Sequence, residues 1–364
     1  MDESLLKRLG ELRKRIDRID IEIVLLLKER LSMAFEIGKA KADARQDMFD
    51  LGREQEVMDN ILRDNAGAFP PAVLKVIFSE IISACRNAQR PSKVGFFGPE
   101  TTFTHMAATR FFGHAPCFVP LNTITDVFEE VERGRVDFGV VPMENSIEGT
   151  VSLTLDGFCE FKVKVCGEIY LPISHDLMSQ SGRIDNIRRI LSHPHAIAQC
   201  RMWLQKNLPA VPVEEFVSTA QAARWAAVDP SVAAIASPLA ASTYNLQTVA
   251  RHIEDFADNT TRFLVLGLGC QKPSGNDKTS ILLSLEDRPG SLYQLLEPLA
   301  KRGINLTKIQ SRPVKNEPWR YLFYVDIAGH IDDPKVKEGV DAIKEGCAFL
   351  EWLGSYPQGS LAED

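Results

Sequence analysis

From the N-terminus to about Ala44, apolar side chains recur at alternating intervals of three and four, the heptad spacing of a helix that packs along another helix. The apolar positions are Leu9, Leu12, Ile16, Ile19, Ile23, Leu26, Met33 and Ile37. Arg30 occupies the next core position of this repeat. A guanidinium there must be paired or face a polar cavity, unless the register slips and the side chain reaches solvent.

The length of this helix favours pairing with a second chain. A helix of ~35 residues would be about 50 Å long, too long for a helical segment of about 90 residues to cover by itself. On one straight helix, Arg13 and Arg30 are ~25 Å apart, and Arg30 and Lys41 are ~16 Å apart. Two chains packed antiparallel would bring Arg13 of one chain near Arg30 and Lys41 of the other. The pattern therefore predicts a cationic pocket suited to a small dianion.

The pattern of apolar residues along the chain changes twice, which predicts three domains within its 364 residues. Residues 1–91 are expected to be all-α, with further helices at about 50–64 and 71–88. In residues 92–271 short apolar strands alternate with helices, as in an α/β fold with two lobes around a cleft. Residues 278–357 predict a βαββαβ unit of the α+β, ferredoxin-like class. Its expected strands are 279–285, 304–313, 319–327 and 348–353, and its expected helices are 291–302 and 333–345.

Composition narrows the function classes. A net charge of −7 argues against a dedicated nucleic-acid binder, and no apolar run approaches the ~20 residues of a membrane span. The charged N-terminus predicts no signal peptide, and seven scattered cysteines without a CxxC motif indicate reduced thiols in a cytoplasmic protein. No metal site is expected, because His193 and His195 have no Cys or acid at ligand spacing. No nicotinamide cofactor is expected, because no GxGxxG motif follows a predicted strand.

Motifs of the helical part occur in a definite order. They are Arg13, Arg30, GKAK at 38–41, DxxRE at 50–54 and IISACRNAQ at 81–89. In this order they resemble the all-helical chorismate mutases. The resemblance implies an intertwined dimer that rearranges chorismate to prephenate. This Claisen rearrangement needs no nucleophile and no general base, because the enzyme holds the reactive conformer and stabilises charge on the ether oxygen.

The resemblance also implies a role for each cation of the helical part. Arg13 of the partner chain and Arg30 would bind the two carboxylates, a task that suits the planar guanidinium. Lys41 and Gln89 would donate hydrogen bonds to the ether oxygen.

The remaining contacts of this site are implied in the same way. Asp50 and Glu54 would hold the ring hydroxyl, with Arg53 nearby. Cys85 stands where the family often has serine, and a thiol is the weaker donor. We therefore expect a small effect at Cys85.

Polar loops follow several predicted strands of the α/β part, which is where ligands bind in open sheets. They are GPETTFTH at 98–105, PMENS at 142–146, SHPH at 192–195 and STAQAA at 218–223. Singly, each has a structural explanation, because strand-end loops are polar in any α/β domain and Ser218 or Thr219 can cap a helix. Together they could line one cleft.

With NTTRF at 259–263, these loops resemble prephenate dehydratase, whose fold is two α/β lobes around a hinged cleft, periplasmic-binding-protein-like. The implied reaction removes CO2 and the ring hydroxyl of prephenate, and it needs a donor near the leaving hydroxyl. Thr261 has the position that the family treats as essential. Arg262 would be a carboxylate partner, although it could instead hold the loop. The other residues implied for the cleft are Phe263, Glu144, Asn145, Ser146, His193, Gln199, Ser218 and Thr219.

In the C-terminal part, GSLY at 290–293 and QSRP at 310–313 resemble the phenylalanine-contacting motifs of an ACT domain. A Gly-Ser turn that opens a helix offers backbone N–H groups to a carboxylate, and a strand of a second subunit could close over the side chain. Gln310 stands where the family commonly has glutamate, which could weaken recognition of an ammonium group. A plain dimerisation unit of the same fold is the alternative. The implied contacts are Gly290, Ser291, Leu292, Asn305, Gln310, Ser311, Arg312 and Pro313.

As a whole, the motifs resemble the bifunctional chorismate mutase–prephenate dehydratases, or P-proteins. The resemblance implies chorismate and prephenate as substrates, L-phenylalanine as inhibitor, no cofactor, and a homodimer or larger homo-oligomer. Neither nucleic acid nor a membrane is expected as a partner. One alternative is a mutase fused to a prephenate dehydrogenase, which would need the missing nicotinamide motif. The other is a non-enzymatic sensor of small anions or amino acids.

Overall fold

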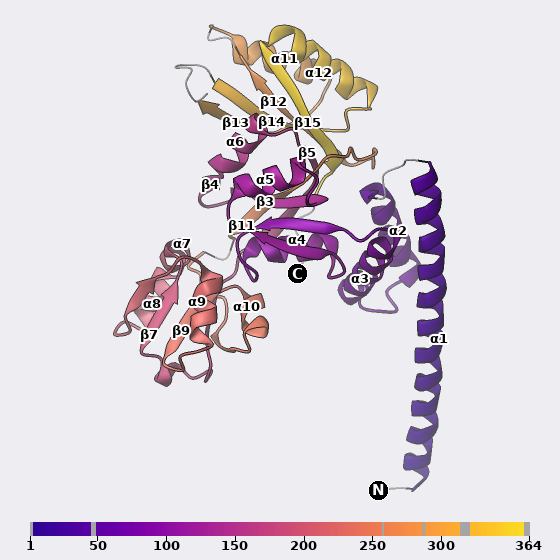
Figure 1. Ribbon diagram of the computed structural model, residues 1–364, viewed down its shortest axis with the longest axis vertical. Helices are drawn as coiled ribbons and strands as arrows, with labels where there is room; N and C mark the ends of the chain where they lie inside the picture. The colour runs from indigo at the N-terminus through magenta and orange to yellow at the C-terminus, as the bar shows by residue number, and fades with distance from the viewer. Residues whose placement is uncertain (1–2, 45–48, 257, 286–287, 314–320, 360–364) are drawn as a thin grey trace. The chain divides into compact units, whose positions relative to one another are not determined.

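The computed structural model describes residues 3–44, 49–256, 258–285, 288–313 and 321–359. The chain forms two compact units, a helical unit that contains most of residues 1–92 and an α/β unit that contains most of the rest (Figure 1). Within the described ranges, no helix combines the length and apolar character needed to cross a bilayer.

The described part of the helical segment forms the three predicted helices. They are α1 Glu3–Asp43, α2 Leu51–Asn65 and α3 Pro71–Gln89. Pro71 begins α3, a position where the missing N–H of proline costs nothing and its fixed φ suits the helix. At Gly38, α1 lies so close to α3 that a Cβ atom would come within 3.0 Å of the Gln89 Cβ atom. A small residue at position 38 therefore permits this helix packing.

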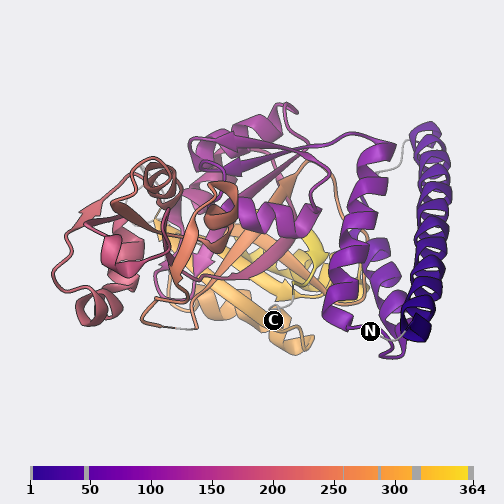
Figure 2. The ribbon, with the colours of Figure 1, turned by 90° about the horizontal axis from the view of Figure 1, so that it is seen from below.

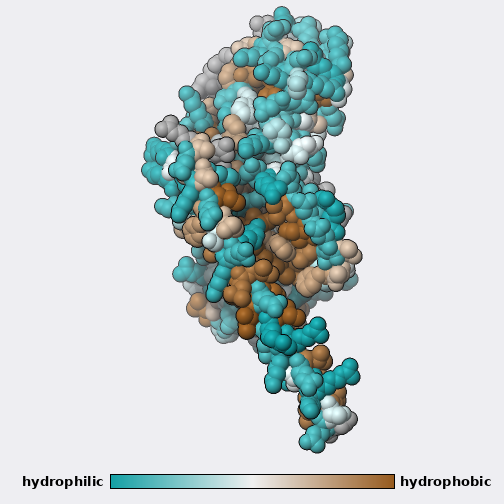
Figure 3. All heavy atoms as spheres, turned by 90° about the vertical axis from the view of Figure 1, so that its right-hand side faces the viewer, coloured by the Kyte–Doolittle hydropathy of each residue, from teal (hydrophilic) through white to brown (hydrophobic). Residues whose placement is uncertain are grey.

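Most of the heptad stripe of α1 is uncovered within one chain. Ala34 and Gly38 are the buried residues of its 41. The heptad side chains are exposed, from 39% for Leu9 to 64% for Leu26. Figure 3 shows apolar side chains exposed on the helical unit. Apolar surface of this extent normally marks a contact with another molecule.

The first lobe of the α/β unit is a sheet of order β2-β1-β3-β11-β5, with the short β4 beside β3. Its strands are β1 Lys93–Phe97, β2 Cys117–Leu121, β3 Phe138–Asn145, β4 Gly149–Thr150, β5 Lys164–Pro172 and β11 Thr260–Gly267, and its helices are α4 Phe103–Phe112, α5 Ile124–Glu132 and α6 Ser152–Glu160. β1 is parallel to β2 and β3, so the loops that follow β1 and β3 leave the sheet at the same edge.

The second lobe is a sheet of order β10-β6-β9-β7-β8. Its strands are β6 Asp176–Ser179, β7 Arg189–Ser192, β8 Val213–Glu215, β9 Val232–Ala236 and β10 Gln247–Ala250, and its helices are the 3-10 helix Ile184–Asn186, α7 Pro194–Gln199, α8 Arg201–Asn207, α9 Thr219–Ala226 and α10 Pro238–Thr243. The chain enters this lobe after β5 and returns to the first lobe through β11. Two segments therefore connect the lobes, as a hinge requires.

The C-terminal part is the predicted βαββαβ unit, an antiparallel sheet of order β13-β14-β12-β15. Its elements are β12 Asp277–Ser284, α11 Ser291–Lys301, β13 Leu306–Pro313, β14 Tyr321–Ala328, α12 Pro334–Gly346 and β15 Phe349–Pro357. β15 runs four residues beyond its predicted end, because its last residues pair with the start of β12. The predicted loop at 314–318 lies outside the described residues.

Strand β12 of this C-terminal sheet is buried on both of its faces, and its alternating side chains enter two different cores. Ile281 and Leu283 of β12 pack under α11 and α12, whereas Leu282 joins the core of the first lobe. At Gly354 of β15, a Cβ atom would lie 2.2 Å from the Val165 carbonyl oxygen of β5. The backbone of the C-terminal sheet thus lies directly against the first lobe, which Figure 2 shows from a second direction.

Candidate active site

A cavity of about 340 Å³ lies between the two lobes of the α/β unit. Its walls come from the loops after β1, β3 and β5, from the first turns of α7 and α9, and from β11. Predicted residues that line it are Asn145, His193, Gln199, Ser218, Thr219, Thr261 and Phe263. The polar loops that the sequence places at four strand ends therefore do meet in one cleft.

Three predicted residues lie outside this cavity. Ser146 exchanges hydrogen bonds with the backbone of Asp258 and Thr260. Glu144 forms an ion pair with Lys308 of β13, and Arg262 is buried against Glu168 and Asp326. Because side chains alternate along a strand, Thr261 and Phe263 face the cavity and the intervening arginine faces the C-terminal sheet.

Hydrogen bonds between amide side chains connect the cavity wall. Asn145 Nδ2 donates to Thr261 Oγ1 at 2.8 Å and to Asn259 Oδ1 at 2.7 Å. Asn145 Oδ1 accepts from the backbone N–H groups of Ile147 and Glu148, which fixes the orientation of its amide. The Thr261 oxygen is thus an acceptor toward Asn145, which leaves its own O–H group available as a donor to a molecule in the cavity.

His175 lines the same cavity, although sequence reasoning did not select it. Its Nε2 lies 2.9 Å from Gln199 Oε1, while Gln199 Nε2 donates to Glu148 Oε1 at 3.0 Å. This arrangement places the proton of a neutral imidazole on Nε2. Nδ1 is buried, with no hydrogen-bond partner in the described part of the chain. The only signal in the sequence was a histidine just after an apolar strand, and every polar residue at such a strand end gives that signal.

Burial governs the charge of the cavity histidines. It lowers the pKa of His175 more than the Gln199 hydrogen bond and the nearby carboxylates raise it. Burial and the neighbouring His195 likewise lower the pKa of His193. His195 Nδ1 is paired with Glu148 Oε2 at 3.0 Å. At neutral pH, the cavity therefore presents uncharged imidazoles at positions 175 and 193.

The residues expected for the mutase site lie along the three helices. Arg13 is exposed and Arg30 half-buried on α1, and the helix between them is unbroken, so one chain cannot bring the two guanidinium groups together. Lys41 is half-buried near the end of α1, and Gln89 packs against Gly38.

Around α2 and α3, Glu54 accepts two hydrogen bonds from Arg86 Nη1, at 2.7 and 2.8 Å. Asp50 is half-buried, Arg53 is exposed and Cys85 is buried. Arg86 lies in the IISACRNAQ stretch but was not itself selected. Its contact with Glu54 joins residues 32 apart, which helical periodicity does not pair.

The motifs expected to bind phenylalanine lie on two elements of the C-terminal βαββαβ unit, α11 and β13. Gly290, with φ of +88°, precedes α11, while Ser291 and Leu292 form its first turn. Gln310 Oε1 accepts a hydrogen bond from Thr150 Oγ1, and Arg312 pairs with Asp156. Asn305, Ser311 and Pro313 are exposed. The Gln310 and Arg312 side chains of β13 thus contact the first lobe.

Comparison with known proteins assigns a family to each part. Residues 12–90 match the chorismate mutase type II model, residues 94–270 the prephenate dehydratase model and residues 279–344 the ACT domain model. The bifunctional chorismate mutase/prephenate dehydratase of Aquifex aeolicus is 49% identical over 362 residues, 98% of this chain and 100% of the relative. The chain belongs to the family of bifunctional chorismate mutase/prephenate dehydratases.

Two further relatives agree with this assignment. The bifunctional enzyme of Pseudomonas aeruginosa is 40% identical over 97% of this chain and 99% of its own length. The crystal structure of prephenate dehydratase from Arthrobacter aurescens in complex with L-phenylalanine is 34% identical, with a TM-score of 0.68, over 73% of this chain and 90% of that chain. The predicted family, the three-part fold class and both enzymatic activities are confirmed.

The described lining of the cavity between the lobes contains no lysine and no arginine. Charge complementarity for an anionic substrate is available instead at the N-termini of α4 and α9, one from each lobe. Thr102, Phe103 and Thr104 bring the first turn of α4 to the cavity, and Ser218 and Thr219 bring that of α9. Helix N-termini present unpaired N–H groups and a partial positive charge.

The lowered pKa of His175 makes the α/β unit sensitive to acid. Because its folded pKa lies below its ordinary value of 6.5, the unfolded chain takes up the proton first as the pH falls through that value. The contribution of the neutral imidazole to the free energy of unfolding is therefore complete above about pH 6.5 and is lost as the pH falls below it. We expect the α/β unit to unfold at a lower urea concentration at about pH 5.5 than at about pH 7.5. This difference in the urea midpoint should be smaller in His175→Gln.

Tryptophan fluorescence measures this transition selectively, since Trp203, Trp225, Trp319 and Trp352 all lie outside the helical segment. His114→Gln is the matched control, because that exposed histidine belongs to the helical unit. Equal pH dependence in the wild type and His175→Gln would contradict the assignment.

Proposed function

We propose that Thr261 and Asn145 form the centre of the dehydratase reaction. The single observation that supports this is the hydrogen bond from Asn145 Nδ2 to Thr261 Oγ1 inside the cavity. In the reaction, the bond to the departing carboxylate breaks, its electron pair completes the aromatic ring, and the ring hydroxyl leaves. One proton converts that hydroxide to water. Thr261 stabilises the leaving oxygen with its O–H group, which Asn145 orients.

The two carboxylates of prephenate bind, in this proposal, at the first turns of α4 and α9. These two turns reach the cavity from opposite lobes, so a dicarboxylate would hold the lobes together. Thr219 and Ser218 belong to the second of these turns, and His193 and Gln199 complete the wall around the ring.

The two active sites of the chain are expected to fail independently. Thr261→Ala should reduce phenylpyruvate formation by at least about 2.7 kcal/mol of transition-state stabilisation, roughly a hundredfold, and leave chorismate consumption unchanged. Arg30→Ala should instead reduce chorismate consumption and leave phenylpyruvate formation from prephenate unchanged. Each activity is measured on the same purified full-length chain with chorismate or prephenate supplied. Parallel loss of both activities in Thr261→Ala would refute its catalytic role.

We also propose that the mutase site is shared between two chains. The uncovered heptad stripe of α1 supports this pairing, and so does the separation of Arg13 and Arg30 along one straight helix. In an antiparallel pair, Arg13 of one chain and Arg30 with Lys41 of the other would meet around the substrate.

We propose a cytoplasmic location for the protein. The buried thiols of Cys85 and Cys200 support a reducing environment.

Mixed dimers test the shared site. Arg13→Ala and Arg30→Ala should each lose mutase activity, because every shared site then lacks one guanidinium. In a mixed dimer, one site lacks both guanidinium groups and the other site retains both. Because equal co-expression makes about half of the dimers mixed, it should restore about a quarter of wild-type mutase activity. Dehydratase activity is the internal control. No recovery above the separate variants would contradict a site built from two chains.

We propose L-phenylalanine as the effector of the ACT domain. The first turn of α11 after Gly290 can receive its carboxylate, and the related dehydratase from Arthrobacter aurescens is in complex with L-phenylalanine. Ser291 and Leu292 lie in that turn, and Asn305, Ser311 and Pro313 are exposed for contact with a second subunit. Gln310 and Arg312 already contact the first lobe, so binding at QSRP would compete with those contacts.

Steady-state kinetics test this regulation. Phenylalanine at about millimolar concentration should reduce phenylpyruvate formation, and a bulky Gly290→Val change should weaken the effect, because position 290 has a positive φ. The matched control is Gly346→Ala, since that glycine lies at the far end of α12 with open space around it. An unchanged rate at millimolar phenylalanine in the wild type would refute the proposal.

A further inference from the structure

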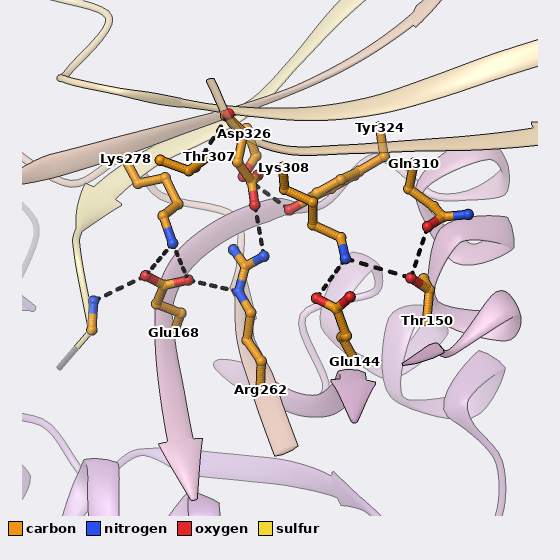
Figure 4. A network of polar contacts seen from close by, with 12 residues as sticks. Glu144, Thr150, Glu168, Arg262, Lys278, Thr307, Lys308, Gln310, Tyr324 and Asp326 are labelled. Carbon is orange, nitrogen blue, oxygen red and sulfur yellow. Dashed lines mark hydrogen bonds and ion pairs between the residues drawn. The ribbon is translucent and has the colours of Figure 1, made fainter. Parts of the chain in front are cut away.

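Strand β13 of the ACT domain places a lysine on the outer side of the dehydratase active-site wall. Lys308 Nζ lies 2.5 Å from Glu144 Oε2 and donates a longer hydrogen bond, of 3.4 Å, to Thr150 Oγ1 (Figure 4). Thr150 in turn donates to Gln310 Oε1 at 3.0 Å. One face of β13 thus holds both β3 and β4 of the first lobe.

Burial of the lysine distinguishes this ion pair from a surface contact. The two carboxylates are about equally exposed, Glu144 at 38% and Glu297 at 39%, but Lys308 is 10% exposed whereas Lys301, which pairs with Glu297, is 67% exposed. A largely desolvated ammonium group needs its carboxylate partner, whereas an exposed pair contributes little. The contact between Lys308 and Glu144 therefore restrains the position of β3.

Glu144, the residue that Lys308 holds, is the immediate neighbour of Asn145 in the cavity wall. Glu144 and Asn145 are neighbours on β3 and face opposite sides, and Arg262 and Thr261 are neighbours on β11 and do the same. The register pairs Thr261 directly with Asn145, and Arg262 directly with Glu144. The inner pair lines the cavity, and the ACT domain holds the outer pair.

We propose that Lys308 is a positioning residue of the dehydratase reaction. By holding Glu144, it fixes β3 so that Asn145 keeps the Thr261 hydroxyl aimed at the leaving oxygen. The proposal rests on the role given above to Thr261 and Asn145. It also assigns Glu144 a place outside the substrate site, as the residue that receives the contact from the regulatory domain.

The helices that bind the substrate carboxylates in our proposal do not depend on this contact, so kcat and KM should respond differently. We expect Lys308→Met to lower kcat for phenylpyruvate formation roughly tenfold or more, with KM for prephenate nearly unchanged. Lys308→Arg should restore most of the activity. Glu144→Gln should reproduce the loss, and the double variant should be no worse than either single variant, because both remove one interaction.

Two controls keep this test decisive. Lys301→Met removes the exposed lysine of the same domain and should leave kcat unchanged. Mutase activity and the urea midpoint by tryptophan fluorescence, measured on each full-length variant without phenylalanine, report whether the chain is folded. If Lys308→Met stays within twofold of wild type, loses activity through KM alone, or lowers mutase activity in parallel, the proposal is overturned. Losses that multiply in the double variant would also overturn it.

The design separates this proposal from the one on which it rests. An active Thr261→Ala variant would refute the proposed dehydratase centre. An inactive Thr261→Ala with a fully active Lys308→Met would leave that centre standing and refute the role of Lys308 alone.

Discussion

The buried charge cluster around Arg262 is the interaction on which the architecture of the α/β unit depends. Its guanidinium donates to Glu168 at 2.7 Å and to Asp326 at 2.6 Å, and Lys278 Nζ donates to both oxygens of Glu168 (Figure 4). Burial by itself lowers the pKa of Arg262, but Asp326 and the other facing groups outweigh it and raise the pKa, so the side chain stays charged. Removing one member of such a buried cluster costs about 3–5 kcal/mol.

The cluster joins strands from two parts of the fold. Arg262 and Glu168 belong to the first lobe of the dehydratase, whereas Asp326 and Lys278 belong to the ACT sheet. Arg262 and Glu168 pair within the first lobe, whereas Asp326 pairs with Arg262 and Lys278 pairs with Glu168. The two buried charges of the ACT sheet therefore have these partners only when the sheet lies against the first lobe. The same requirement appears in the backbone at Gly354, where only a residue without a Cβ atom fits against Val165. The regulatory domain is therefore part of the structure that shapes the catalytic wall.

Sequence reasoning succeeded where local patterns suffice. Periodicity placed the three helices of the mutase segment, and alternation placed the βαββαβ unit. The strand-end loops placed Asn145 in a cleft, and the resemblance to prephenate dehydratase added Thr261. Sequence reasoning could not decide which side of β11 faces that cleft. Successive side chains of a strand point to opposite faces, so Thr261 and Arg262 must point apart. Only the three-dimensional structure shows that the arginine points to Asp326. Glu144 is the same case on β3, and His175 lacked any pattern that distinguished it from other strand-end residues.

The orientation of Arg262 also has a chemical consequence. A guanidinium bound to the carboxylate that leaves as CO2 would stabilise the substrate more than the transition state, in which that charge has moved toward the ring and the leaving oxygen. Such binding would slow decarboxylation. Helix N-termini carry only a partial charge, so they can hold a carboxylate with less of this cost. In the mutase reaction both carboxylates remain, so the full arginine charges that we propose at positions 13 and 30 carry no such penalty. In our proposal, the two reactions thus meet dicarboxylate substrates with different kinds of positive charge, because only the dehydratase must release a carboxylate.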